Sequence, residues 1–367
     1  MSLSSRLDAL HAALRIDAEE TDREGEFPTR SFQLLRSAGL LSAPVPKVAG
    51  GESLGEPARL GELLELLARI GHASLVVGRV YEGHVNALAL ISRYGRDDQR
   101  ERWYADARDG CLFGVWNTEA EGGVVMTSAG SGWRLAGAKT FASGCGHVDR
   151  ALVTAAQEGG WQMAIVDTNR QVPSEDRQFW KPLGMRASAS FRADFTGTTL
   201  SGDDLLGVPG DYYAEPMFSG GAVRFAAVQQ GGVEAVFDET RRYLAALGRT
   251  GDPHQRMRLG AMAMAVESGR LWLRSAADRE GASEDTPEQV VNYAALVRTA
   301  IETNALLVMR LAERSVGARG LIRPEIFERL HRDLTHYLRQ PAPDAVLENA
   351  GAHVLARPSE PASQLWN

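Results

Sequence analysis

Two apolar runs joined by a glycine-rich bend decide the fold: CLFGVWNTEAEGG at residues 111–123 and WRLAGAKTFASGCGH at residues 133–147. Each run has strand-forming residues that lead into small ones, as Trp116 leads into Asn117 and Phe141 into Ser143. Strand ends of this kind expose backbone N–H groups and short hydroxyls beside an aromatic ring. They suit a flat heterocycle with polar edges, because the rings stack while amides and hydroxyls bond to the heteroatoms. The alternative is two plain strands that end in ordinary turns.

The pair resembles the flavin-binding core of the acyl-CoA dehydrogenase family, in which a TEP-glycine-serine strand end precedes a GxKxWITN strand. Thr118-Glu119 and GAKTFASG at residues 137–144 occupy those places. The resemblance implies that Phe141 lies against the flavin ring and that the Ser143 hydroxyl reaches its N5/O4 edge. The residues implied to hold the pyrimidine side are Val115, Asn117 and Thr118.

The order of elements predicts an α+β protein in three parts. Residues 1–110 carry apolar stripes at helical spacing, residues 111–206 read as strands, and residues 207–367 contain four long helices with short links. By the resemblance, these are an N-terminal helical domain, a middle β-barrel domain and a C-terminal four-helix bundle. FPTRSFQLLRSAGLLSAPVPKVAGG (27–51) and KPLGMRASAS (181–190) are also similar to segments of that family.

Composition excludes several classes of function. The net charge is -7 and the basic residues are scattered, which argues against a nucleic-acid surface. The two cysteines, Cys111 and Cys145, have no metal-type partners nearby, so we expect neither a disulfide nor a metal site. No apolar run approaches membrane-spanning length and the first residues lack a signal-peptide core. We therefore expect a cytoplasmic protein that does not bind membranes.

A second part of the cofactor site is implied by GARG at residues 317–320 and PEIFERLHRDL at residues 324–334, which resemble family segments. In the family, a neighbouring subunit uses this turn to hold the adenine end of FAD. The resemblance thus implies FAD rather than FMN, and a homodimer or homotetramer, since a lone subunit would leave half the site open. A plain helix C-cap is the alternative for Gly317. The residues implied to reach the FAD of a partner are Arg249, His254, Gln255, Arg314 and Gly317.

The sequence departs from the family where the substrate would react. Counting on from Arg332, the usual catalytic glutamate falls at Pro341, and the alternative position, one residue before Arg224, is Val223. Removing an α-proton from a thioester requires a positioned base, so the catalytic residue stays unknown. The family serine that contacts the acyl-CoA corresponds to Val124.

His84 stands in an apolar stretch, GHVNALAL at residues 83–90. A buried, hydrogen-bonded histidine is the more common outcome for such a position. The functional interpretation rests on analogy, because flavin-dependent monooxygenases of this fold place a histidine at a similar position facing the substrate. The residues expected at the substrate pocket are therefore His84, Val124, Arg224 and Pro341.

Three functions follow from these patterns. The leading expectation is FAD-dependent oxidation of an acyl thioester, carried by CoA or an acyl carrier protein, with an unknown redox partner. The second is a flavin-dependent monooxygenase, which uses reduced flavin and oxygen and needs no α-proton base. FASGCGH at residues 141–147 resembles a segment of such hydroxylases. The third is a non-catalytic member of the fold.

Overall fold

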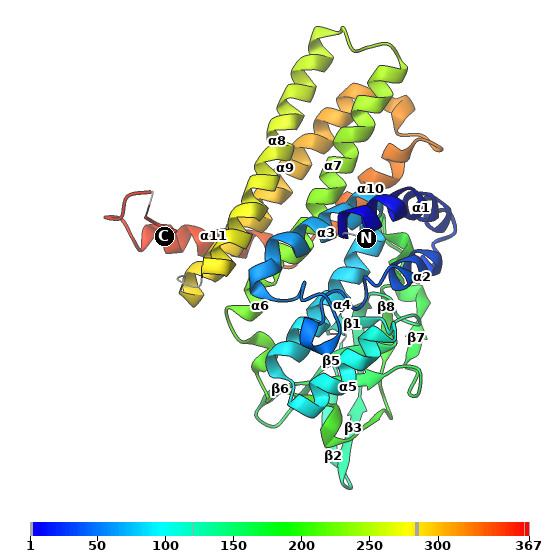
Figure 1. The fold of residues 1–367 in the computed structure, drawn as a ribbon, viewed down its shortest axis with the longest axis vertical. Coiled ribbons are helices and arrows are strands. Elements are labelled where there is room, and N and C mark those ends of the chain that lie inside the picture. The colour runs from blue at the N-terminus through cyan, green and yellow to red at the C-terminus, as the bar shows by residue number, and fades with distance from the viewer. Residues whose placement is uncertain (1–2, 120, 283–285, 363, 367) are drawn as a thin grey trace.

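The computed structural model describes residues 3–119, 121–282, 286–362 and 364–366 (Figure 1). Long helices form one end of the molecule and the strands form the other. The N-terminal helices lie between the two, since one of them packs on the bundle and the next packs on the first strand. The molecule thus follows the expected order of helices, strands and helices. The domain boundaries at residues 110 and 206 stay predictions.

From residue 3 onward, the N-terminal part contains five α-helices, and the two most apolar of them, α3 and α4, are the most buried. Their bounds are α1 (Leu3–Glu24), α2 (Thr29–Ser37), α3 (Leu60–Ala73), α4 (Leu75–Tyr94) and α5 (Asp97–Arg108). Ser74 ends α3 and caps α4, because its side chain accepts a hydrogen bond from the Val77 N–H. Gly71 lets α3 approach the bundle closely, since a Cβ there would lie 2.3 Å from the carbonyl oxygen of Val228.

The strands form two sheets. The seven-stranded sheet has the order β10-β6-β5-β2-β3-β9, with β1 paired in parallel to β5. Its strands are β1 (Phe113–Trp116), β2 (Val125–Ala129), β3 (Gly132–Ala136), β5 (Arg150–Gln157), β6 (Gly160–Asp167), β9 (Thr199–Leu200) and β10 (Leu205–Leu206). The second sheet has the order β4-β8-β7, from β4 (Ala138–Ala142), β8 (Phe191–Asp194) and β7 (Ser174–Asp176). Pairing among the described residues closes neither sheet into a barrel, so the barrel stays an expectation from the resemblance.

The helical bundle follows. Its long helices are α7 (Ala222–Ala246), α8 (Pro253–Ala282), α9 (Pro287–Gly320) and α10 (Ile326–Tyr337), with α6 (Met217–Gly220) before them and α11 (Pro343–Leu355) after. Thr286 and Gln289 form a capping box at the start of α9. Gly317 has φ 67° and ψ -172°, which breaks the helix inside the GARG turn.

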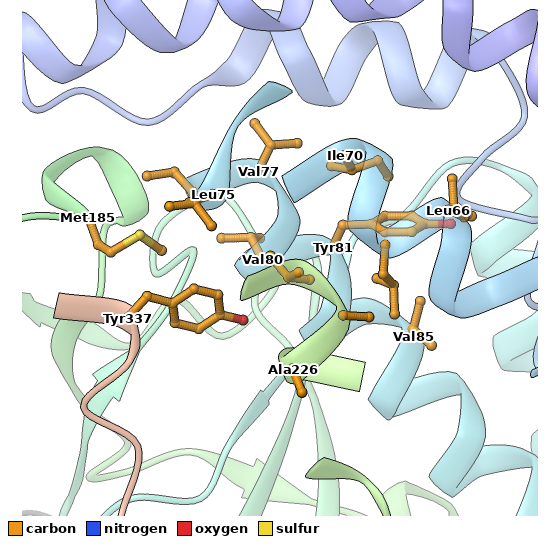
Figure 2. Packing of buried hydrophobic residues seen from close by; sticks show 14 of the residues in the cluster. Leu66, Ile70, Leu75, Val77, Val80, Tyr81, Val85, Met185, Ala226 and Tyr337 are labelled. Atoms are coloured by element: carbon orange, nitrogen blue, oxygen red, sulfur yellow. The ribbon is translucent and has the colours of Figure 1, made fainter. Parts of the chain in front are cut away.

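One large hydrophobic core joins the helices to the sheets, and a smaller one lies where α4, α5 and β6 meet. Figure 2 shows the centre of the large core, where side chains of α3 and α4 pack beside Ala226 of α7 and Tyr337 of α10. Across the described ranges, none of the helices has both the length and the hydropathy that a bilayer crossing needs.

Candidate active site

The two stretches singled out in the sequence lie side by side at one end of the sheets. The Thr140 N–H donates to the carbonyl oxygen of Thr118 at 2.9 Å, and the Thr140 hydroxyl donates to that of Glu119 at 3.0 Å. The Trp116 indole N–H donates to the carbonyl oxygen of Ser143 at 2.9 Å. The end of β1 and the end of β4 therefore form one continuous edge.

A buried lysine holds this edge together. Lys139 is fully buried, and its Nζ donates to the carbonyl oxygen of Asn117 at 3.1 Å and to Oγ1 of Thr154 at 2.9 Å. It also pairs with the Glu119 carboxylate. Burial lowers the pKa of Lys139, while the bond to Glu119 opposes this shift. Thr154 in turn donates to Oδ1 of Asn117 at 2.7 Å, so the network fixes both the backbone and the side chain of Asn117.

An aromatic ring stands out from the edge. Phe141 has φ 52° and remains 49% exposed, although it is large and apolar. A non-glycine residue in the left-handed region is uncommon and points to a functional constraint. Two residues along the chain, the Ser143 hydroxyl lies 2.9 Å from that of Ser190. An exposed flat ring beside hydroxyl and amide groups fits a flavin, with Phe141 against its face and Ser143 and Asn117 at its polar edges.

Aromatic contacts join this edge to the end of α10. Phe141 meets Trp180 edge-on with ring centroids 6.0 Å apart, and Trp180 meets His336 edge-on at 5.3 Å. The segment that carries Trp180 is also tied to α10 directly, because the Met185 N–H donates to the buried Asp333 carboxylate at 2.6 Å. The family-like KPLGMRASAS segment thus bridges the strands and the bundle.

Residues 211–218, which precede α7, lie against the strand end that carries Asn117. The Tyr213 hydroxyl donates to Oδ1 of Asn117 at 3.0 Å. Tyr213 also packs edge-on against Tyr212 and Phe218, with ring centroids 5.0 Å and 5.1 Å away. Residues 211–218 therefore lie over the strand end that carries Asn117.

Three polar side chains of α4 lie between the end of β1 and the start of α7. Arg79, Glu82 and Asn86 lie on one face of the helix because they are three and four residues apart. Arg79 Nη1 donates to Glu82 Oε2 at 2.6 Å, and Asn86 donates to Glu82 Oε1. Arg224, in the first turn of α7, donates to Asn86 Oδ1 at 2.5 Å. We refer to Arg79, Glu82 and Asn86 as the polar row.

Tyr337, the last residue of α10, faces the polar row. It is buried, and its hydroxyl has no hydrogen-bond partner among the described residues. Burial, and then the charge of Glu82, raise the pKa of Tyr337 well above its usual value, so the phenol keeps its proton. Sequence reasoning missed Tyr337 and all three residues of the polar row. The available signal was three polar residues at helical spacing in an otherwise apolar helix.

His84 lies in the core instead of at an open surface. Its Nε2 lies 2.7 Å from the carbonyl oxygen of Leu41, and its Nδ1 accepts from the Phe113 N–H at 3.1 Å. These bonds assign the neutral tautomer with the proton on Nε2. Burial lowers the pKa of His84 to about 4. Both ring nitrogens are occupied by the backbone, which matches the interpretation of His84 as a buried structural histidine.

The other expected pocket residues are spread apart. Val124 is fully buried in the core, where its N–H donates to Glu119 Oε2 at 2.8 Å. Pro341 is exposed in the turn between α10 and α11, and its carbonyl oxygen accepts from Arg298 at 3.1 Å. Of the four residues expected at the pocket, Arg224 is the one that donates a hydrogen bond to the polar row, through Asn86.

The residues expected to hold the cofactor of a partner gather at the far end of the bundle, away from the strands (Figure 1). Arg249 and Gln255 line a cavity of about 530 Å³ between α7 and α8, together with Arg241, Arg242 and Arg256. The buried Gln255 Oε1 has no partner within the described ranges. The N–H of His254, next to Gln255, donates to Asp252 at 2.8 Å. Arg258 joins α9 to this end, since it donates to the carbonyl oxygen of Arg314 at 3.0 Å, one turn before Gly317.

Comparison with known proteins identifies the family. The model for the N-terminal domain of acyl-CoA dehydrogenases matches residues 8–110, and the model for their C-terminal domain matches residues 210–337. The chain therefore belongs to the acyl-CoA dehydrogenase family, whose members carry out flavin-dependent oxidation.

Individual relatives divide between two chemistries. The chain is 26% identical to a dibenzothiophene monooxygenase of Rhodococcus erythropolis, over 93% of this chain and 90% of the relative. It is 25% identical to the mitochondrial short-chain specific acyl-CoA dehydrogenase of Mus musculus, over 86% and 80%. The crystal structure of TdsC, a dibenzothiophene monooxygenase from Paenibacillus sp. A11-2, with FMN and indole has the same fold, with a TM-score of 0.86 and 23% identity over 99% of both chains.

Proposed function

We propose that the chain is a flavin-dependent monooxygenase that uses reduced FMN and oxygen. The observation that carries this proposal is that neither family position for the catalytic glutamate holds a carboxylate. Pro341 and Val223 occupy the two positions where the family resemblance puts the catalytic glutamate, and neither side chain can accept a proton. A monooxygenase of this fold does not need that proton transfer.

The relatives support this proposal over the leading expectation of acyl thioester oxidation with FAD. Dibenzothiophene monooxygenases are among the relatives that span most of the chain, and TdsC is bound to FMN. We therefore reverse the expected order of cofactors and propose FMN ahead of FAD.

The residues of the candidate site would have distinct tasks. Reduced FMN, when bound, supplies the electrons for oxygen insertion. Phe141 would support one face of its ring, while Ser143 and the groups near Val115, Asn117 and Thr118 would bond to its edges. The buried Lys139 network keeps Asn117 in place, and the Tyr213 hydroxyl donates to its side chain.

Assembly follows from where the two parts of the site lie. We propose that the arginine-lined cavity at the bundle end binds the phosphate-bearing part of a flavin held by a second copy, since guanidinium groups bind phosphates well. An apolar face on α8 supports a homodimer or homotetramer: Met257, Met264 and Leu271 are exposed at seven-residue spacing. Met264 and Leu271 line a hollow of about 740 Å³ with Trp272.

Acyl thioester oxidation is the second candidate, because the short-chain acyl-CoA dehydrogenase is a relative over most of its length. A single pair of assays separates the two. The FMN-loaded protein is mixed with butyryl-CoA without oxygen, and the flavin absorbance is followed. The same protein is then supplied with reduced FMN, oxygen and a heteroaromatic or organic-acid panel, and oxygenated product is measured.

We expect no flavin bleaching by butyryl-CoA and the formation of an oxygenated product from at least one compound of the panel. Bleaching at about 10 per second, a usual enzymatic rate, would overturn the proposal in favour of a dehydrogenase. A folded protein that binds neither FMN nor FAD would favour the non-catalytic alternative.

A further inference from the structure

We propose that Arg79 and Tyr337 bind an oxyanion on the substrate, so that the substrate is a small organic acid with a carboxylate or sulfinate group. This inference rests on the proposed function, because it assigns the substrate class of the same site. It comes from side chains of α4 and α10 that the flavin-binding edge does not use.

The two donors lie beside the candidate flavin edge. Gly83, on α4 next to Glu82, lies between Arg79 and the strand end that carries Val115. A Cβ at Gly83 would lie 3.9 Å from Arg79 Nη1 and 3.9 Å from the Val115 backbone nitrogen. Tyr337 follows His336, which contacts Trp180 and through it Phe141. The polar row and Tyr337 therefore border the place where the flavin ring would lie.

Glu82 does not compete for this role. It is only 3% exposed, and both of its carboxylate oxygens are engaged, Oε2 by Arg79 and Oε1 by Asn86. Arg224 holds Asn86 from the side of α7. The Glu82 carboxylate orients Arg79 and Asn86, and the ion pair with Arg79 balances its charge. Arg79 and Tyr337 keep hydrogen-bond donors that no described residue accepts.

Arg79 has the chemistry and the access to bind an oxyanion. Its side chain is 30% exposed, although most residues of α4 are buried. Only Nη1 is hydrogen-bonded, to Glu82, and its other nitrogens donate to no described residue. The planar guanidinium presents donors in a fork that matches two oxygens of a carboxylate or sulfinate.

Tyr337 supplies the second observation. In Figure 2 its hydroxyl is directed into the space between Val80 of α4 and Ala226 of α7. A buried hydroxyl without a partner is costly, and a fold that keeps one usually uses it. Because the phenol stays protonated, it can donate to a negatively charged oxygen. A neutral heteroarene such as dibenzothiophene would leave both donors unpaired, which a site of this kind disfavours strongly.

The test measures binding of benzenesulfinate, benzoate and indole to the FMN-loaded protein by titration calorimetry. We expect one or both acids to bind at least about tenfold more tightly than indole. Tyr337→Phe should weaken acid binding about tenfold, as the loss of one hydrogen bond to a charged group does. Arg79→Gln should weaken it further, and Arg79→Lys should restore part of the affinity. Which acid binds more tightly tells whether the oxyanion is a carboxylate or a sulfinate.

Tyr81→Phe is the matched control. Tyr81 is equally buried on α4, but its hydroxyl donates to the carbonyl oxygen of Leu40 at 2.7 Å. This control should lower the melting temperature and leave acid binding unchanged. Tyr337→Phe should instead weaken acid binding and leave the melting temperature unchanged. If indole binds as tightly as both acids, or if Tyr337→Phe lowers stability without changing acid affinity, the inference is overturned. Repeating the titrations on the flavin-free protein separates it from the proposed function, because acid binding there does not require FMN or oxygen.

Discussion

Single residues at the strand ends carry most of the cofactor argument. Phe141 is held in the left-handed region and stays exposed, and Ser143 begins a chain of three hydroxyls that continues through Ser190 to Ser188. Phe141 packs edge-on against Phe179 and Trp180, yet about half of its surface stays open. Both arrangements are explained if a flat, polar-edged ring lies on Phe141 and bonds to Ser143.

Ser143→Ala tests this assignment. We expect the dissociation constant for FMN to rise about five- to tenfold, because one hydrogen bond to the ring edge is lost. The melting temperature should change little, because Ser190 keeps its bond to Ser188. Fluorescence titration of FMN gives the affinity, and Ser188→Ala is the control. An unchanged affinity together with unchanged turnover would refute the role of Ser143.

The lowered pKa of His84 makes the free energy of unfolding depend on pH. Its pKa is about 4 in the folded protein and 6.5 in the unfolded chain, so the unfolded state binds more protons between these values. The free energy of unfolding should therefore fall as the pH drops from 6.5 toward 4, by about 3 kcal/mol from this group. His11 acts in the same direction, since burial lowers its pKa to about 4. Asp333 opposes them, because burial raises its pKa to about 6.

Urea unfolding of the wild type and of His84→Gln, at several pH values between 4.5 and 7, measures this term. Glutamine can keep both backbone hydrogen bonds but does not titrate. The slope of stability against pH should be smaller in the variant by close to one proton. Parallel curves for the two proteins would show that His84 is not held neutral by burial.

At the scale of elements, the decisive feature is that the end of β1 and the end of β4 meet over the Lys139 side chain. Lys139 serves three partners from inside the sheets, and the backbone of Asn117 depends on it. The buried Lys139 amine takes the place of an apolar side chain in the core, and its hydrogen bonds fix the two strand ends relative to each other.

Lys139→Met should cost about 2–3 kcal/mol of unfolding free energy, because Asn117 and Thr154 lose a partner while the partly exposed Glu119 is rehydrated. FMN affinity should fall as well, since the strand end is no longer fixed. Denaturant unfolding and FMN titration check both effects. Lys181→Met, at an exposed lysine, should change stability by less than about 0.5 kcal/mol. Equal stabilities of the two variants would contradict the structural role of Lys139.

At the scale of the whole molecule, the proposed cofactor site combines residues of two copies of the chain. The arginine-lined cavity lies at the end of α7 and α8 that is farthest from the strands (Figure 1), whereas Phe141 belongs to β4 and reaches α10 through Trp180. A second copy would bring one bundle end to the strand ends of the other, and the apolar face of α8 is a suitable contact for it.

Met264→Glu places a charge on that face, where Met264 is 76% exposed in the single chain. We expect light scattering to show a shift toward the monomer mass, with weaker FMN binding, because burying an unpaired carboxylate at an interface is unfavourable. Val172→Glu, at an exposed valine between β6 and β7, should leave assembly unchanged. A wild-type protein that is already monomeric and still binds FMN would disprove the shared site.

The sequence alone determined the order of helices, strands and helices, because apolar periodicity is a local property of the chain. The family resemblance also predicted that residues 111–123 and 133–147 belong to one flavin-binding core. It did not reveal α5, whose sequence is strongly polar, or α11, which packs mainly on α9 at the end of the bundle. The apolar periodicity that identifies a helix in sequence is weak in both α5 and α11.

Only the tertiary structure decided the composition of the site. The sequence left His84 open between a buried structural histidine and a pocket residue. Its surroundings come from residues 41 and 113, which place both ring nitrogens against backbone. The spacing of Arg79 and Glu82 on an apolar helix was a weak signal and Tyr337 gave none, because their role depends on how α4 and α10 pack together. Whether a polar side chain is satisfied or left with a free donor is set by neighbours far away in the chain, and local sequence does not contain that information.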